Sequence, residues 1–245
     1  MATVSLLKAL TNAGIGSRRR LADAIRQSRV EVNGEVIEGF NYPVNIETDR
    51  ILIDKQLVDL KGEPVLYLIL NKPKGILSTM KDERGRRTVT DILPRKYRRL
   101  RLYPVGRLDK DSTGLLLITN DGHLTYELTH PSFEHEKEYL AQISTKLRPS
   151  DKRKLEQGIK LEDGLTHPAL VKEVASLPAF TYSITIHEGR KRQLRRMFQS
   201  IGHRVLALKR IRLGNLNLGD LEEGKTRELS TNETRRLLRH NTRAQ

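Results

Sequence analysis

The feature that most constrains this chain is the stretch 101–122, which reads RLYPVGRLDKDSTGLLLITNDG. Its polar turn, 106–114, leads into an almost wholly apolar run at 115–119. A short, continuous apolar run of this kind is typical of a strand buried on both faces. The turn-forming residues at 120–122 end that strand. Asp109 is therefore expected in a loop held by a core strand, where catalytic groups are often found.

The residues of this stretch are more specific than a turn and a strand require. Gly-Arg-Leu-Asp at 106–109, Thr-Gly-Leu-Leu-Leu at 113–117 and Thr-Asn-Asp-Gly at 119–122 resemble the signature of pseudouridine synthases. The closest wording is that of the ribosomal small-subunit pseudouridine synthase A family, which also includes large-subunit synthases. This resemblance implies that Asp109 is the nucleophile and that Arg107 fills the space left by the extruded base and holds a phosphate. Without it, Asp109 would be read as a turn residue beside an exposed arginine.

A second run, Glu-Gly-Arg-Lys-Arg-Gln-Leu-Arg-Arg-Met at 188–197, opens a predicted helix and is similar to another motif of the same family. The resemblance implies that Arg195, the arginine after Gln-Leu, pairs with the nucleophile and keeps it ionised. Arg190 and Arg192 in this run are predicted to contact RNA.

Tyr139 lies in an alternating stretch, Lys137 to Ile143, and by sequence alone is an ordinary aromatic residue of a sheet. Family members have a tyrosine in a similar Lys-x-Tyr context that stacks on the target base, a role that suits a flat ring. A second role, removal of the C5 proton, is less favoured because an unperturbed phenol has a pKa near 10.

The composition indicates a polyanionic partner. Lys and Arg number 45 against 30 Asp and Glu, a net charge of +15, which favours nucleic acid first and an anionic membrane surface second. No apolar stretch approaches the roughly 20 residues of a membrane span, and no signal peptide is evident. With no cysteine, scattered histidines and no Gly-rich nucleotide fingerprint, we expect no metal, no cofactor and a cytoplasmic location.

The N-terminal residues predict a small separate module. Apolar spacing indicates a helix over 3–13, and Ser17 is a predicted N-cap for a second helix over 18–27. Asn33-Gly34 between alternating residues predicts a hairpin. Together these features resemble the alpha-L RNA-binding module. The alternative is a generic basic mini-domain.

Three consecutive cations open the second of these helices. They oppose the helix dipole, and a nearby phosphate backbone would offset that cost. They are therefore predicted to contact RNA, and they are Arg18, Arg19 and Arg20.

The remaining patterns give the domain boundaries and the fold class. We expect the module at 1–60, a linker at 59–63, a catalytic domain at 64–235 and a basic tail at 236–245. A buried strand at 65–70 precedes Asn-Lys-Pro-Lys-Gly, whose Lys72 and Lys74 are predicted to contact RNA. The resemblance implies an α+β pseudouridine synthase fold, with a mixed, mainly antiparallel sheet flanked by helices and a cleft across its middle.

The expected function is isomerisation of a specific uridine in rRNA by a monomeric enzyme. Large-subunit rRNA is favoured because more members of the group act there. The sequence does not decide whether Asp109 attacks C1′ or C6. Two alternatives remain: a basic RNA-binding or ribosome-assembly protein, which would not need the pair of Asp109 and Arg195, and an RNA methyltransferase, which the missing Gly-rich loop disfavours.

Overall fold

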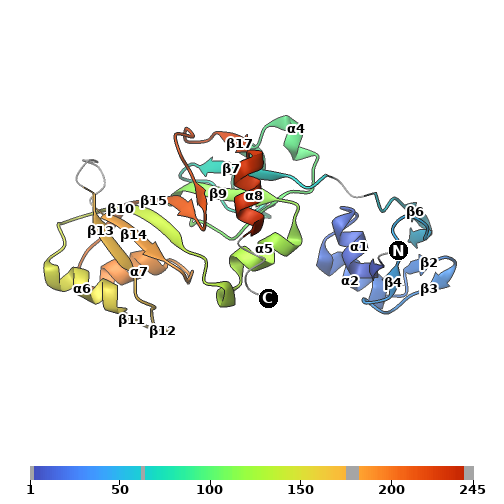
Figure 1. The fold of residues 1–245 in the computed structure, drawn as a ribbon, viewed down its shortest axis with the longest axis horizontal. Helices are drawn as coiled ribbons and strands as arrows, with labels where there is room; N and C mark the ends of the chain where they lie inside the picture. Colours follow the sequence, from blue (N-terminus) through green and yellow to red (C-terminus); the bar gives the residue numbers. More distant parts are fainter. Residues whose placement is uncertain (1–2, 62–63, 175–181, 240–245) are drawn as a thin grey trace. The chain divides into compact units, whose positions relative to one another are not determined.

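The structure, a computed structural model, describes residues 3–61, 64–174 and 182–239. The chain divides into two compact units. The first comprises Met1–Leu66 with Asn120–Gly122, and the second comprises Tyr67–Thr119 with His123–Gln245. Figure 1 shows the strands and helices of the first unit, residues 4–58, in shades from blue to teal. Among the described residues no helix is both long and apolar enough to cross a membrane.

The N-terminal unit packs two helices and two small sheets around a core of its own. One sheet is the pair β1-β4 and the other has the order β3-β2-β5-β6. The elements are β1 (Val4–Ser5), α1 (Leu6–Asn12), α2 (Arg18–Arg26), β2 (Val30–Val32), β3 (Glu35–Val36), β4 (Pro43–Val44), β5 (Ile51–Ile53) and β6 (Gln56–Val58).

Local sequence signals act in this unit as expected. The hydroxyl of Ser17 accepts a hydrogen bond of 3.1 Å from the backbone N–H of Arg20, so Ser17 caps α2. Asn33 and Gly34 have φ angles of 53° and 92°, as a hairpin turn of the primed type requires, and β2 pairs with β3 on either side of them. The predicted linker, 59–63, ends in residues outside the described part of the chain.

The second unit contains one large sheet. Its strands are β7 (Tyr67–Lys72), β8 (Tyr103–Pro104), β9 (Thr113–Thr119), β10 (Lys137–Ile143), β13 (Leu170–Glu173), β14 (Tyr182–Ile186), β15 (Val205–Leu213), β16 (Leu216–Asn217) and β17 (Thr226–Glu228). A separate hairpin pairs β11 (Lys160–Leu161) with β12 (Gly164–Leu165). The helices are α3 (Val89–Ile92), α4 (Arg95–Arg98), α5 (Gly122–Thr129), the 3-10 helix η1 (Pro131–Phe133), α6 (Pro149–Gln157), α7 (Gln193–Ser200) and α8 (Thr231–Arg239).

The nine-stranded sheet has the order β13-β14-β10-β15-β9-β7-β17, with β16 on β15 and β8 on β9. Its pairs are antiparallel except for β15 with β9, which run parallel. The expected mixed, mainly antiparallel sheet is confirmed. The strand expected at 180–187 is described only from Tyr182, because 175–181 lie outside the described residues.

Helices α5 and α8 cover one face of β7 and β9. Leu124 and Leu128 of α5 and Leu237 of α8 join the cluster that also contains Leu115 and Leu117 of β9. Leu237 is 3% exposed. The boundary expected between 235 and 236 therefore falls inside α8, because a leucine of that helix packs in the core.

The parallel contact between β9 and β15 is short and close. It pairs Lys209 with Thr113 and Arg210 with Gly114. A Cβ on Gly114 would lie 2.2 Å from the carbonyl oxygen of Arg210 and 2.6 Å from its nitrogen. Gly114 also has a φ of 103°, which side chains rarely tolerate. Glycine is therefore required for the two halves of the sheet to meet.

We expect Gly114→Ala to destabilise the protein by about 2–4 kcal/mol, since backbone strain and overpacking add at this position. Urea unfolding followed by circular dichroism measures the change. The control is Gly219→Ala, where φ is 60° but a Cβ would meet nothing within 4 Å. Equal losses of stability in the two variants would contradict a special role for the β9–β15 contact.

Candidate active site

A pocket of about 540 Å³ lies at the seam between the two halves of the sheet. The loop 105–112 before β9 forms one side, and Lys137 and Tyr139 of β10 with Arg210 of β15 form another. Residues 186–195, at the end of β14, the connection and the start of α7, contribute Arg190, Arg192 and Arg195. The pocket thus gathers groups from segments far apart in the chain, and the predicted site residues Arg107, Asp109, Tyr139, Arg190, Arg192 and Arg195 all line it.

The loop that carries Asp109 is fixed by the loop that follows β7. The hydroxyl of Ser78 donates to the carbonyl of Leu108 at 2.9 Å and accepts from its N–H at 3.1 Å. The N–H of Gly75 donates to the carbonyl of Lys110 at 2.7 Å. These bonds hold the residues on both sides of Asp109.

Lys72 was predicted to contact RNA, but it is buried and instead stabilises the loop that follows β7. Its side chain is fully buried, and its ammonium donates to the carbonyls of Pro73 and Ile76 at 2.8 and 2.9 Å. Burial lowers the pKa of Lys72 to about 8, opposed by the nearby charges of Asp111, Glu223 and Asp109. A buried ammonium stabilises the loop but cannot reach a phosphate backbone. Lys74, by contrast, is exposed.

Asp111 holds two arginines at the pocket. Arg192 makes a bidentate contact with its carboxylate at 3.0 and 3.2 Å. Arg195 approaches the same carboxylate at 3.4 Å and donates to the carbonyls of Asp111 and Val205, each at 3.1 Å. Burial raises the pKa of Asp111, but the hydrogen bonds from Arg192 and the charge of Arg195 outweigh it, so that the pKa lies below its usual value.

The expected ion pair between Arg195 and Asp109 is therefore replaced by one between Arg195 and Asp111. The Asp109 carboxylate has no hydrogen bond or ion pair with any described residue, and Asp109 is partly exposed in the pocket. Its charge, after the larger effects of Asp111, contributes to a raised pKa of Arg192. Asp109 is thus near a guanidinium but is not held by one.

Tyr139 and Arg107 differ in exposure at this pocket, since Tyr139 is buried and Arg107 is exposed. Tyr139 is 9% exposed, with Ile184 and Arg210 as its partners on the neighbouring strands. Arg107 is exposed. Arg192 has a φ of 52°, in a region that non-glycine residues rarely occupy, and such strain is often found at functional sites.

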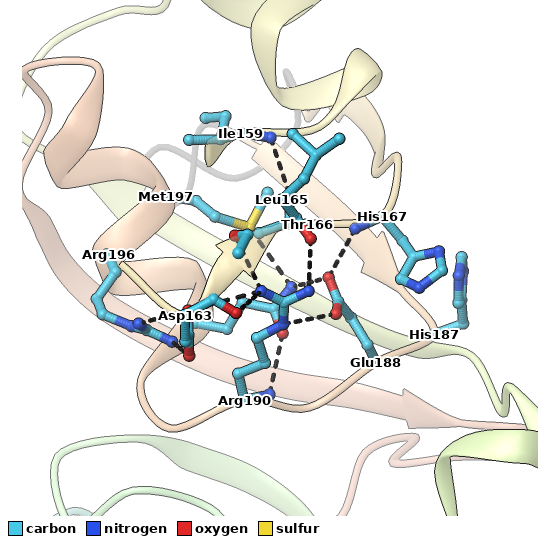
Figure 2. A network of polar contacts seen from close by, with 12 residues as sticks. Ile159, Asp163, Leu165, Thr166, His167, His187, Glu188, Arg190, Arg196 and Met197 are labelled. Atoms are coloured by element: carbon cyan, nitrogen blue, oxygen red, sulfur yellow. Dashed lines mark hydrogen bonds and ion pairs between the residues drawn. The ribbon is translucent and has the colours of Figure 1, made fainter. Parts of the chain in front are cut away.

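Arg190, which was predicted to contact RNA, lines the pocket and also makes several hydrogen bonds within the protein. Figure 2 shows its guanidinium surrounded by acceptors. It donates to Glu188 at 2.9 Å and to the carbonyls of Asp163, Gly164 and Leu165 at 3.1, 3.0 and 2.5 Å. Arg190 therefore fastens the β11–β12 hairpin to the segment that leads into α7.

The network around Arg190 continues into α7. Glu188 accepts from the N–H of His167 at 2.8 Å and from the side-chain amide of Gln193 at 2.6 Å. Asp163 receives a bidentate contact from Arg196 at 2.9 and 2.8 Å. Figure 2 shows Asp163 between Arg196 and Arg190. These contacts fix the start of α7, where Arg195 lies.

Comparison with known proteins agrees with this geometry. Residues 66–200 match the family described as RNA pseudouridylate synthase. Ribosomal large subunit pseudouridine synthase B of Bacillus subtilis is 42% identical over 235 residues, which are 95% of this chain and 94% of that protein. The chain belongs to the RNA pseudouridylate synthase family.

Two further relatives support this assignment. The synthase B of Vibrio cholerae is 41% identical over 219 residues, 87% of this chain and 67% of that protein. The crystal structure of a pseudouridylate synthase has a TM-score of 0.68 and 33% identity, and the match covers 96% of this chain and 99% of that one. The pseudouridine synthase fold and the isomerisation of uridine, both expected from the motifs, are confirmed.

Three side chains at or beside this synthase pocket were missed in the sequence: Lys137 and Arg210 line it, and Asp111 binds two of the arginines that line it. Asp111 stands two residues after Asp109 and could have been recognised as a second acceptor for the arginines. Lys137 and Arg210 interrupt otherwise strand-like runs, and a charged residue there is a signal of a buried polar role. Lys137 donates to the carbonyls of His135 and His187 at 3.1 and 3.3 Å.

We expect Asp111→Asn to slow the chemical step on the order of 10–100-fold, because Arg192 and Arg195 lose the charge that positions them. Single-turnover assays at saturating enzyme measure the rate. Asp82→Asn is the matched control, since Asp82 pairs with Arg86 outside the pocket. A rate for Asp111→Asn equal to that of the control would show that this carboxylate does not organise the site.

Proposed function

We propose that this chain isomerises a specific uridine of ribosomal RNA, and that the substrate is large-subunit rRNA. The relatives from Bacillus subtilis and Vibrio cholerae carry that substrate in their names. The net charge of +15 suits a polyanionic partner. We further propose that the enzyme acts as a monomer in the cytoplasm.

One observation carries the proposed chemistry. Asp109 presents a carboxylate without a partner among the described residues, in a pocket that is also lined by Tyr139 and five arginines. A carboxylate that is free of protein donors can attack a substrate, whereas Asp111 is held by Arg192 and Arg195. This contrast supports Asp109 as the nucleophile.

The reaction is an isomerisation. The bond between C1′ and N1 of the uridine breaks, the base turns, and C1′ joins C5. The C5 proton leaves and N1 gains a proton, so that product and substrate have the same atoms. Tyr139 would stack on the extruded base, which must leave its helix at a cost of a few kcal/mol.

RNA binding is assigned to the exposed cations. Of the cations predicted to contact RNA, Lys74, Arg107 and Arg192 are exposed in the second unit, and Arg192 also holds Asp111. In the first unit they are Arg18, Arg19 and Arg20 on the first turn of α2, all exposed. The helices, hairpin and separate core of the first unit support an alpha-L RNA-binding module.

We expect Asp109→Asn to bind rRNA as the unchanged protein does and to lose more than about 10³-fold in rate, because an amide is not a nucleophile here. Tritium release from RNA labelled at uridine C5 measures the reaction, and filter binding measures affinity. Asp220→Asn, in an exposed turn outside the pocket, is the control. Retained activity in Asp109→Asn would remove the proposed mechanism.

Replacing Arg18, Arg19 and Arg20 together by Ala is expected to weaken rRNA binding and to reduce the salt slope by up to about 2–3, one per lost phosphate contact. Binding measured from low to high salt tests this. The control replaces Lys152, Arg153 and Lys154 of α6 by Ala, which removes the same charge elsewhere. Equal slopes in the two triple variants would contradict an RNA-binding role for α2.

A further inference from the structure

Some of the buried polar atoms without hydrogen-bond partners lie at the pocket. Among the described residues, Ser112 Oγ, Arg195 Nε and Arg210 Nη2 are buried and have no hydrogen-bond partner, and all three residues line the pocket. Buried polar groups are nearly always hydrogen-bonded, so such atoms need an explanation. Ser112 and Arg195 belong to the Asp111 region. Arg210 comes from the other half of the sheet.

Arg210 is anchored at one end of its guanidinium. It is 3% exposed, and its Nε donates to the carbonyl of Leu115 at 2.7 Å. No carboxylate forms an ion pair with Arg210 among the described residues. A buried guanidinium without a counter-ion is costly, and here its backbone partner satisfies only one of its five N–H groups.

A second cation lies on the same side of the pocket. Lys137 lines the pocket and is partly buried. Burial and, after it, the charge of Arg210 lower the pKa of Lys137 to about 8, opposed by Glu188. Arg210 is directly opposite Tyr139 on the paired strands. The residue expected to stack on the base therefore stands beside two groups that only donate hydrogen bonds.

These donors suit the charge that the reaction creates. When the C1′–N1 bond breaks, both electrons remain with the base, and the negative charge spreads over N1 and the carbonyl oxygens O2 and O4. Groups that are already oriented toward developing charge lower the barrier most effectively in a site that excludes water. Uracil offers carbonyl acceptors, and Arg210 and Lys137 offer only donors.

We propose that Arg210, with Lys137 beside it, hydrogen-bonds a carbonyl oxygen of the target uracil and stabilises the negative charge on the base while it is detached from C1′. This inference rests on the proposed function. It holds for attack of Asp109 at either C1′ or C6, because the glycosidic bond breaks in both. Arg195 is the weaker candidate, since its guanidinium is already bound to Asp111 and to the carbonyl of Val205.

The test pairs a protein change with a change of one substrate atom. The RNA is a fragment containing the uridine that the unchanged enzyme modifies, synthesised with uridine, 2-thiouridine or 4-thiouridine at that position. Sulfur accepts hydrogen bonds poorly. We expect the unchanged enzyme to lose about 10–100-fold in single-turnover rate with one of the two thio-substituted RNAs, as for a hydrogen bond to a charged group.

Arg210→Met is expected to lose a similar factor in rate on the uridine RNA. Replacing oxygen by sulfur should then lower its rate by less than about 3-fold, a loss called the thio penalty, because the protein change and the sulfur remove the same contact. Arg212→Met is the matched control. It removes an arginine of the same strand that is bound to Glu136 and Glu138 and lies outside the pocket lining. It should keep the full penalty.

Arg210→Lys keeps the charge and covers the case in which Arg210→Met does not fold, which thermal unfolding by circular dichroism would reveal. It should retain more activity than Met and show a reduced thio penalty. If Arg210 served only to hold the carbonyl of Leu115, its replacement would lower the single-turnover rate on all three RNAs by the same factor. Equal thio penalties in the unchanged enzyme and in the Arg210 variants would overturn the inference.

The outcome is separable from the proposed function. If the unchanged enzyme forms no pseudouridine in any rRNA fragment, the proposed function fails. If it forms pseudouridine and shows no penalty with either thio-substituted RNA, the function stands and only the role of Arg210 fails.

Discussion

The close parallel contact between β9 and β15 is the constraint on which the catalytic unit depends. It joins two antiparallel groups of strands through only two residue pairs, Lys209 with Thr113 and Arg210 with Gly114. The backbone of Gly114 lies where any side chain would collide with Arg210. This one glycine therefore sets how close the Asp109 loop lies to the strands that carry Tyr139 and Arg210.

The loop before β9 carries two carboxylates, Asp109 and Asp111, that differ in their partners. Asp111 takes the ion pairs with Arg192 and Arg195, and its pKa is lowered as a result. Asp109 keeps its carboxylate free of described protein donors. The guanidiniums are thus held in place without occupying the group that is proposed to react. Ser78 bonds to the Asp109 loop at Leu108, and Lys72 bonds to the loop after β7 that carries Ser78.

The sequence predicts elements whose signal is local. The apolar run of β9, the Ser17 cap and the Asn33-Gly34 hairpin are set by neighbouring residues, and each forms as expected. The resemblance of the motifs also predicted a common site for Asp109, Tyr139 and Arg195, and all three line one pocket. What the sequence could not supply is the environment of each cation, because burial and partners come from distant segments.

Lys72 and Arg190 illustrate this limit. Both lie in basic stretches that resemble RNA-contacting surfaces, but one ammonium is enclosed by its own loop and one guanidinium is surrounded by acceptors of a hairpin about 26 residues earlier in the chain. Arg210 shows the converse. It lies in a strand that also contains Lys209 and Arg212, and its lack of a counter-ion is visible only in the folded chain.

The way Arg190 holds the β11–β12 hairpin bears on how this region can vary among related sequences. Three of its hydrogen bonds go to backbone carbonyls, at Asp163, Gly164 and Leu165, and a carbonyl is present whatever the side chain. The bonds from Arg190 would therefore persist if Leu165 changed, whereas Asp163 also binds Arg196 through its side chain and Gly164 has a φ of 107°. An insertion or deletion there, by contrast, would move the carbonyls themselves and shift the arginines of α7 with them.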